Sequence, residues 1–180
     1  MTDLPIIGVD PGPKYSALVL YLPSDGAIGS GAPVITDMLY LLNDGIAHYL
    51  RSAGTERRVL AIEMIASYGM AVGREVFETC VWIGRFIECS RPMKVQKVYR
   101  ADVKMHLCRN MRAKDTNVRQ ALIDKFGPPG TAKNPGLIYG MKGDLWSALG
   151  VAVTYAEGGQ NLAPPEDDAA PMDLQGIPAE

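Results

Sequence analysis

Ligands for soft metals are scarce in this sequence, and so are thiols that could pair. The 180 residues contain three cysteines (Cys80, Cys89 and Cys108) without Cys-x-x-Cys spacing, and two isolated histidines, His48 and His106. These counts argue against a disulfide framework, a thiolate zinc site and a histidine-based metal site. Reduced thiols are expected, as in a cytosolic protein.

Long apolar runs are also missing. The start of the chain lacks the basic segment and apolar core of a signal peptide. No apolar run approaches the roughly 20 residues that span a bilayer. The sequence therefore predicts a soluble, cytoplasmic protein, and a membrane is not among the expected partners.

The chain has no overall excess of positive charge, because its formal net charge is −2. The charges are nevertheless unevenly placed. Eleven of the eighteen Lys and Arg residues lie between Arg91 and Lys133, against three acidic residues there. Residues 157–180 contain six acidic residues and no Lys or Arg. A basic strip of this kind is what the phosphate backbone of a nucleic acid needs, although it can also be a solvated edge.

Apolar runs and turn-forming residues indicate an α/β fold in a single domain, residues 1–156. Strands are predicted over residues 6–10, 15–21, 33–36, 59–63 and 95–99. Helices are predicted within residues 37–54, 72–91, 101–109, 116–126 and 144–155, with Asp37 and Asp115 as helix N-caps. Together they predict a mixed five-stranded sheet flanked by helices. Residues 157–180 are acidic and rich in Gly and Pro, which predicts a disordered tail.

Two predicted strands end in a carboxylate, Asp10 and Glu63, and Asp144 opens the last predicted helix with Ser147 one turn later. If the two strands are neighbours, their terminal carboxylates converge, and the helix can deliver the third. Clustered carboxylates repel one another unless they share a hard divalent cation such as Mg²⁺. Two such ions about 3.5–4 Å apart suit attack of water on a phosphodiester. The cluster beside the basic strip predicts a metal-dependent phosphodiesterase.

Four motifs occur in an order that resembles the RuvC-type Holliday junction resolvases, which have the RNase H-like fold. They are Gly8-Val9-Asp10-Pro11-Gly12; Ala61-Ile62-Glu63; Val103-Lys104 with Ala113-Lys114-Asp115-Thr116-Asn117-Val118; and Asp144-x-x-Ser147-Ala148-Leu149-Gly150-Val151-Ala152. The resemblance covers roughly residues 6–155. The amino-acid sequence over Met64–Met70 and Val118–Asp124 most resembles the RuvC-type resolvases carried by bacteriophages and prophages.

The resemblance implies a homodimeric, Mg²⁺-dependent endonuclease, with Mn²⁺ as a substitute, that nicks four-way or other branched DNA symmetrically. It implies that Asp10, Glu63 and Asp144 are the catalytic metal ligands. It also implies that Lys104 and Lys114 contact DNA near the scissile phosphate.

The chain departs from the family at two positions. Ser147 stands where the family usually has a second acidic residue, and Asp115 stands where it has a lysine, one place after Lys114. We therefore expect Asp144 alone to ligate from its helix, with Ser147 holding a water molecule and Asp115 capping the next helix. A site with three carboxylates is expected to hold its second ion loosely.

Further candidates come from exposed side chains and an unusually apolar helix. Arg112 in the basic strip is a candidate DNA contact, and Tyr68 could stack on an opened base, although a half-buried tyrosine at the edge of the core is the commoner case. The helix predicted to contain residues 72–87 is apolar nearly all round, so it is a candidate dimer interface as well as a core element.

Two other function classes fit part of the pattern. One is a protein that keeps the fold and binds branched DNA without cutting it, which the serine at position 147 makes conceivable. The other is an ATPase of the actin and sugar-kinase type, whose first strand ends in a similar Asp-x-Gly turn. At 180 residues the chain has little room for the second lobe of such an ATPase. Cleavage with Mg²⁺ or Mn²⁺ separates nuclease from binder, and ATP binding identifies the third class.

Overall fold

A five-stranded mixed sheet forms the centre of the protein in a computed structural model that describes residues 4–23, 31–55, 57–66 and 71–159. Its strands are β1 (Ile6–Asp10), β2 (Tyr15–Leu22), β3 (Val34–Leu42), β4 (Val59–Met64) and β5 (Lys94–Tyr99). The strand order is β3-β2-β1-β4-β5, in which β1 runs antiparallel to β2 and parallel to β4. The predicted mixed five-stranded sheet is confirmed.

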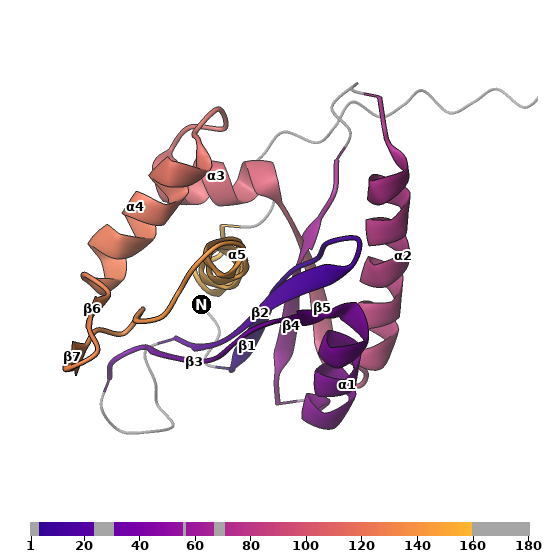
Figure 1. Cartoon of the computed structure of the whole chain (residues 1–180), viewed down its shortest axis with the longest axis horizontal. Coiled ribbons are helices and arrows are strands. Elements are labelled where there is room, and N and C mark those ends of the chain that lie inside the picture. The colour runs from indigo at the N-terminus through magenta and orange to yellow at the C-terminus, as the bar shows by residue number, and fades with distance from the viewer. Residues whose placement is uncertain (1–3, 24–30, 56, 67–70, 160–180) are drawn as a thin grey trace, which may run out of the picture.

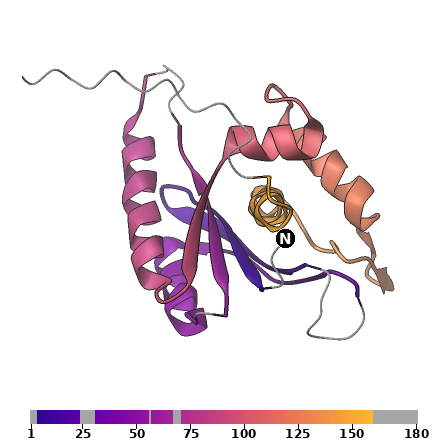
Figure 2. The same cartoon turned by 180° about the vertical axis from the view of Figure 1, so that it is seen from behind.

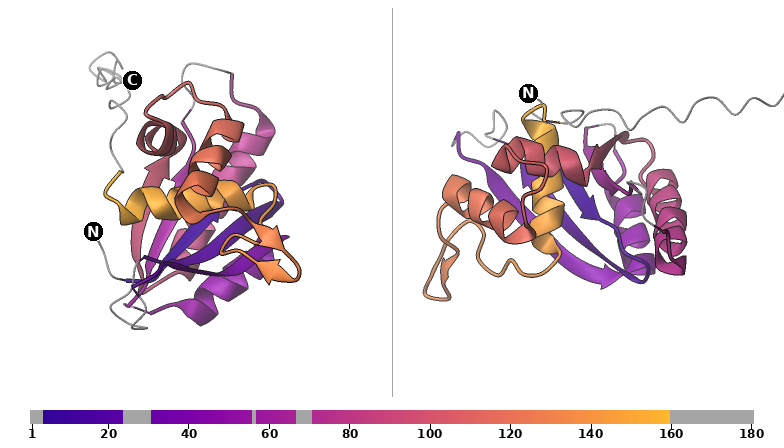
Figure 3. Two further views of the ribbon diagram at one scale, coloured as in Figure 1. Left: turned by 90° about the vertical axis from the view of Figure 1, so that its left-hand side faces the viewer. Right: turned by 90° about the horizontal axis from the view of Figure 1, so that it is seen from above.

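Five helices flank this sheet in layers (Figures 1 and 2). They are α1 (Asn43–Ala53), α2 (Arg74–Cys89), α3 (Arg100–Cys108), α4 (Asp115–Phe126) and α5 (Leu145–Ala156). Helices α1 and α2 cover one face; α5 lies on the other, with α3 and α4 outside it (Figure 3). No helix within the described ranges is long and apolar enough to cross a membrane.

The core has two halves because strand side chains alternate between the faces of the sheet. Ile7 and Leu60 pack toward α1 and α2, whereas Ile6 and Ala61 pack toward α5. Helix α5 is buried at every residue except Ser147. A helix enclosed on nearly all sides is held firmly, so its first turn is a rigid platform.

Helix α5 also lies unusually close to the sheet at Gly8 in β1. A Cβ atom added at Gly8 would lie 2.3 Å from the Ala148 carbonyl oxygen and 2.8 Å from the Ala152 Cβ. Only glycine allows this approach, which places the start of α5 beside the end of β1.

The boundary between β3 and α1 differs from the prediction. Strand β3 continues to Leu42, and α1 begins at Asn43 rather than after Asp37. Asp37 lies in a bulge, with a φ of 49°, where the register on β2 shifts between Leu18 and Leu20. Pairing with β2 extends the strand through residues whose spacing is also compatible with a helix.

The apolar spacing of residues 72, 76, 80, 83 and 87 predicts the face that α2 buries, and the structure confirms this in part. Ile83 is buried with Thr79 and Phe86, and Ile87 packs against the same core, whereas Cys80 is exposed. Val72 precedes the helix and is exposed. Because the helix is apolar on several faces, its spacing pattern shows only in part which face is buried.

Two smaller features lie after α4 and after α5. The loop after α4 contains a short hairpin, β6 (Gly130–Thr131) and β7 (Asn134–Pro135). Glu157, placed in the predicted tail, binds His106 (2.8 Å) and Lys125 (2.5 Å) and is part of the folded body. The rest of that tail, residues 160–180, lies outside the described residues.

Candidate active site

Asp10 and Glu63 lie side by side at one edge of the sheet. The parallel register pairs Val9 with Ile62, so each strand delivers its next residue, a carboxylate, to the same place. Glu63 is only 8% exposed. The two carboxyl groups are close enough for each to shift the pKa of the other. The prediction that these strand ends meet is therefore confirmed, while their role as metal ligands remains a prediction.

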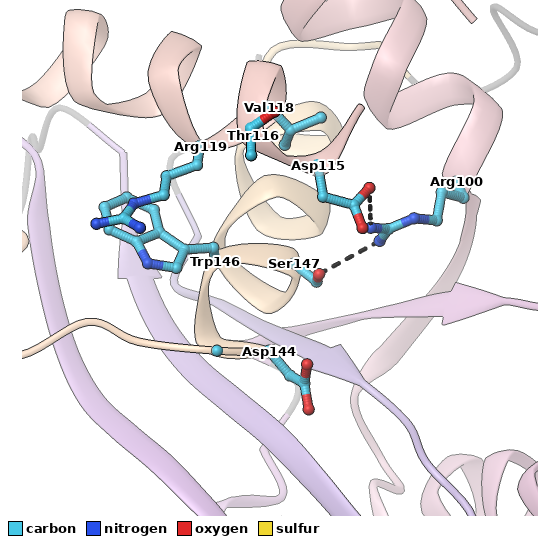
Figure 4. Close-up of a pocket in the computed structure, with 9 residues that line it drawn as sticks. Arg100, Asp115, Thr116, Val118, Arg119, Asp144, Trp146 and Ser147 are labelled. Atoms are coloured by element: carbon cyan, nitrogen blue, oxygen red, sulfur yellow. Dashed lines mark hydrogen bonds and ion pairs between the residues drawn. The ribbon is translucent and has the colours of Figure 1, made fainter. Parts of the chain in front are cut away.

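Asp144 immediately precedes α5 and is exposed, and its side chain makes no capping hydrogen bond. In Figure 4, Asp144 and Ser147 lie on the same side of this helix. Ser147 and Asp144 are both close enough to Asp10 to shift its pKa, Ser147 downward and Asp144 upward. The first turn of α5 thus faces the carboxylate pair.

Arg100, which the sequence did not single out, lies among these groups as the first residue of α3. Its Nη1 donates to Glu63 Oε1 (3.2 Å) and to Ser147 Oγ (3.3 Å). Its Nη2 binds Asp115 Oδ1 at 2.6 Å. Strand β5 pairs with β4 and ends at Tyr99, so the next residue reaches the same sheet edge as Glu63. That register is the signal that could have found it.

Asp115 does not cap α4, so this prediction is wrong. The helix begins at Asp115, and the Asn117 side-chain oxygen accepts the Lys114 backbone N–H at 2.9 Å. The Asp115 carboxylate instead pairs with Arg100 and lies 4.0 Å from Lys104 Nζ. The Arg100 guanidinium offers this carboxylate a short charge-assisted hydrogen bond, and Asn117 takes the capping role in its place.

Three adjoining hollows surround the carboxylates. One of about 320 Å³ is lined by Asp10, Glu63, Arg100 and Lys104. Arg100 also borders a second of about 230 Å³, which contains Asp115, Arg119 and Ser147 (Figure 4). Asp144 separates that hollow from a third of about 580 Å³, lined in part by Tyr40 and Lys142. Asp10 and Glu63 thus line the first hollow, and Asp144 lines the second and the third.

The predicted DNA-contacting residues are placed unequally. Lys104 lines the same hollow as Asp10 and Glu63, with a side chain 21% exposed. Arg112 and Lys114 are exposed in the turn between α3 and α4. Tyr68 lies outside the described residues. The structure thus brings Lys104 to the carboxylates and leaves Arg112 and Lys114 at the surface.

The residues suit a hard divalent cation by their chemistry, but they are not gathered into a finished site. Within the described part of the chain, no three His, Cys, Asp or Glu side chains already converge as metal ligands. Asp10 and Glu63 touch, and Asp144 is the exposed member whose side chain can turn toward them. Carboxylate oxygens are the preferred ligands of Mg²⁺.

The pKa values of Asp10 and Glu63 are raised, as expected for carboxyl groups that are withdrawn from water. Burial, followed by the charges of Glu63 and Asp144, raises the pKa of Asp10 to about 8, although Arg100 and the Ser147 hydrogen bond oppose this. Burial also raises the pKa of Glu63 despite the nearby Arg100. A bound cation would stabilise the ionised forms of these carboxyls.

The raised pKa of Asp10 gives a pH prediction for protein kept free of divalent ions. Between the pKa of 3.8 in the unfolded chain and about 8 in the folded one, the folded protein binds more protons. The free energy of unfolding contributed by Asp10 is therefore fully present below the lower value and is lost as pH rises through the higher one. Urea unfolding in EDTA should show stability falling from about pH 5 to about pH 8, less steeply in Asp10→Asn. An equally steep fall in that variant would contradict the assignment.

A buried polar network fixes the turn after Asp10. The Ser16 hydroxyl donates to Asn43 Oδ1 (2.6 Å) and accepts from the Gly12 N–H (3.1 Å). Asn43 Nδ2 donates to the Gly12 carbonyl oxygen (2.9 Å). Asn43 is 2% exposed and Ser16 is 1% exposed. The network joins β2 and α1 to the turn that leaves Asp10, so it positions that carboxylate.

We expect Asn43→Ala to lower the free energy of unfolding by about 1–3 kcal/mol, because it leaves a buried hydroxyl and a carbonyl without their partner. The exposed Asn134 in β7 provides a control, and Asn134→Ala should change stability by less than about 0.5 kcal/mol. Urea denaturation of both variants measures this difference, and equal losses would show that the network contributes little.

Comparisons with known proteins support the fold. No protein-family model matches the sequence, and no curated protein matches it significantly. RuvC from Thermus thermophilus superposes with a TM-score of 0.63 and 15% sequence identity over 87% of this chain and 98% of RuvC. The same protein in complex with a Holliday junction substrate gives a TM-score of 0.55 and 16% identity over 87% and 96% of the two chains. The predicted RNase H-like fold is thereby confirmed.

Proposed function

We propose that this protein is a divalent-cation-dependent endonuclease that cuts branched DNA, four-way junctions above all, as a RuvC-type resolvase. The observation that carries the proposal is the meeting of Asp10 and Glu63 at one sheet edge, beside Asp144, with Lys104 and Arg119 in the adjoining hollows. The fold is that of a RuvC solved with a Holliday junction substrate. The sequence motifs add a bacteriophage or prophage origin to the proposal.

In this proposal Asp10, Glu63 and Asp144 hold Mg²⁺, or Mn²⁺ in its place. When bound, the cation polarises the phosphate and lowers the pKa of water. The oxygen of a water molecule bonds to phosphorus, the bond to one bridging oxygen breaks, and that oxygen leaves as a hydroxyl after taking a proton. Lys104 lines the same hollow and can hold a phosphate oxygen, while Arg112 and Lys114 can contact the backbone further away.

Symmetric cutting of a junction calls for two sites related by a two-fold axis, and therefore for a homodimer. The face of α2 turned away from the sheet supports this proposal. Phe77 and Val81 lie one turn apart there, with 62% and 63% exposed, and Cys80 between them is exposed too. Apolar side chains gathered on one surface are typical of a protein interface. We place the two-fold interface at this face.

We expect Val81→Asp to convert the dimer into a monomer, because it buries a charge in the contact. Leu42→Asp makes the same change at an exposed position of β3, 51% exposed, and should leave a dimer. Light scattering at tens of micromolar measures both. A wild-type monomer with or without DNA would contradict the dimer proposal, as would a dimer in Val81→Asp.

The function is tested by incubating the protein with a labelled four-way junction, a replication fork and a linear duplex, each in Mg²⁺, Mn²⁺ or EDTA. We expect paired nicks in the junction with either ion, weaker cutting of the fork and none of the duplex. A junction that is bound and left intact with both ions would instead identify a junction-binding protein without nuclease activity.

A further inference from the structure

We propose that the guanidinium of Arg100 is a built-in cation of this site, which takes the place of a second divalent ion, so that each chain binds one. The inference rests on the carboxylate site of the proposed function and adds its ion count and the residue that sets it.

The contacts of Arg100 are those of a cation held among acids. One nitrogen, Nη1, lies 3.2 Å and 3.4 Å from the two oxygens of Glu63, and the other, Nη2, lies 2.6 Å from Asp115. Ser147 adds a neutral oxygen at 3.3 Å. The guanidinium therefore has oxygen neighbours from β4, α4 and α5, three elements that meet only in the folded protein. Figure 4 shows the head group between Asp115 and Ser147.

The position also excludes a second ion by space and by charge. Arg100 binds Glu63, and Asp10 lies beside the same carboxylate at the end of the neighbouring strand. The oxygens of Glu63, Ser147 and Asp115 that could hold a further divalent ion are the ones that the guanidinium contacts. Arg stays protonated at every accessible pH, so the charge cannot be lost by deprotonation.

A charge count leads to the same number. Four carboxylates line the two hollows that Arg100 joins, those of Asp10, Glu63, Asp115 and Asp144. Arg100, Lys104 and Arg119 line the same hollows, so one divalent ion leaves a net charge of +1 and two divalent ions would leave +3. Because Ser147 is neutral, α5 contributes no further carboxylate that could hold a second ion.

Counting bound Mn²⁺ on the full-length protein without DNA tests the inference, by calorimetry and by electron paramagnetic resonance of the free ion. Wild type should bind one Mn²⁺ per chain. Arg100→Gln should bind two, or bind the first at least tenfold more tightly. Arg100→Lys keeps the charge and should return to one. Arg119→Gln removes the same charge beside the same hollow, where Arg119 lies over the Trp146 ring, and should also bind one.

Circular dichroism in EDTA first checks that each variant is folded, and Arg100→Met, a neutral chain of similar length, replaces the glutamine variant if that one is unfolded. Two ions in wild type, or one weakly bound ion in both neutral variants, would overturn the role of Arg100 and leave DNA cleavage untouched. No binding by any variant would overturn the inference and the metal site together. If the numbers of bound ions are as expected but the junction is not cut, the role of Arg100 is supported and the nuclease proposal is contradicted.

Discussion

Asp10→Asn should abolish cleavage of a four-way junction while binding stays intact or becomes tighter. Asp10 lies beside Glu63 at the sheet edge, and the charges of Glu63 and Asp144 both act on it, so its replacement removes a proposed cation ligand at the centre of the site. Losing several kcal/mol of electrostatic stabilisation corresponds to a rate loss of at least about 100-fold. Removing one negative charge also lessens repulsion of the phosphate backbone, so binding should not weaken.

Single-turnover cleavage and gel-shift assays measure the two effects separately. Asp44→Asn is the matched control, because Asp44 is an exposed acid in the first turn of α1, and it should cut at the wild-type rate. An Asp10→Asn protein that also cuts at that rate would remove Asp10 from the site. Weaker binding with unchanged chemistry would instead make Asp10 a DNA contact.

Gly8→Ala should destabilise the protein strongly although it adds only one methyl group. The new Cβ would lie 2.3 Å from the Ala148 carbonyl oxygen, a backbone atom that cannot move aside without shifting α5. Overpacking of this kind costs typically about 1–3 kcal/mol and occasionally more, and we expect the upper end here. Since Asp144 immediately precedes α5 and Ser147 lies in its first turn, cleavage should fall as well, even where the protein remains folded.

Gly84→Ala is the control, because a Cβ at Gly84 in α2 meets nothing within 4 Å. There alanine should raise the free energy of unfolding by roughly 0.5–1 kcal/mol, through its better helix propensity. Urea denaturation of the two variants gives the comparison. If Gly8→Ala were as stable as wild type, the close approach of α5 to β1 would not be a constraint.

The parts of the site that lie at strand ends could be predicted from the sequence. An apolar run that stops at an acidic residue is a local signal, and it located Asp10 and Glu63 before their contact was visible. Asp144 was found in the same way, at the start of an apolar helical segment. Each of these predictions needed only the residues next to it in the chain.

Arg100 and Asp115 could not be assigned in this way, because their roles depend on which strands and helices are neighbours. Within the sequence Arg100 is one basic residue among eleven between Arg91 and Lys133. Its contact with Glu63 arises because β5 lies beside β4, and its contact with Asp115 arises because α4 packs near α3. The local sequence predicts that Asp115 caps a helix, which is the commonest use of an aspartate at a helix start. In the structure Asp115 forms an ion pair with Arg100 instead.

The predicted boundary between β3 and α1 is wrong for a related reason. Residues 37–42 fit a helix by spacing, and pairing with β2 decides that they form a strand. The polar network of Asn43, Ser16 and Gly12 joins residues 31 positions apart at most, so no local pattern could reveal it. Gly8 likewise reads as an ordinary strand residue until α5 is placed against it.

Whether Asp10, Glu63 and Asp144 together hold a divalent ion can be measured without DNA. Fe²⁺ takes the place of Mg²⁺ at oxygen ligands and, with ascorbate and hydrogen peroxide, breaks the polypeptide close to where it is bound. Fragments mapped by mass spectrometry should end near residues 10, 63 and 144, and excess Mg²⁺ should suppress them. Fragments that end elsewhere, with none near these three residues, would contradict the proposed site.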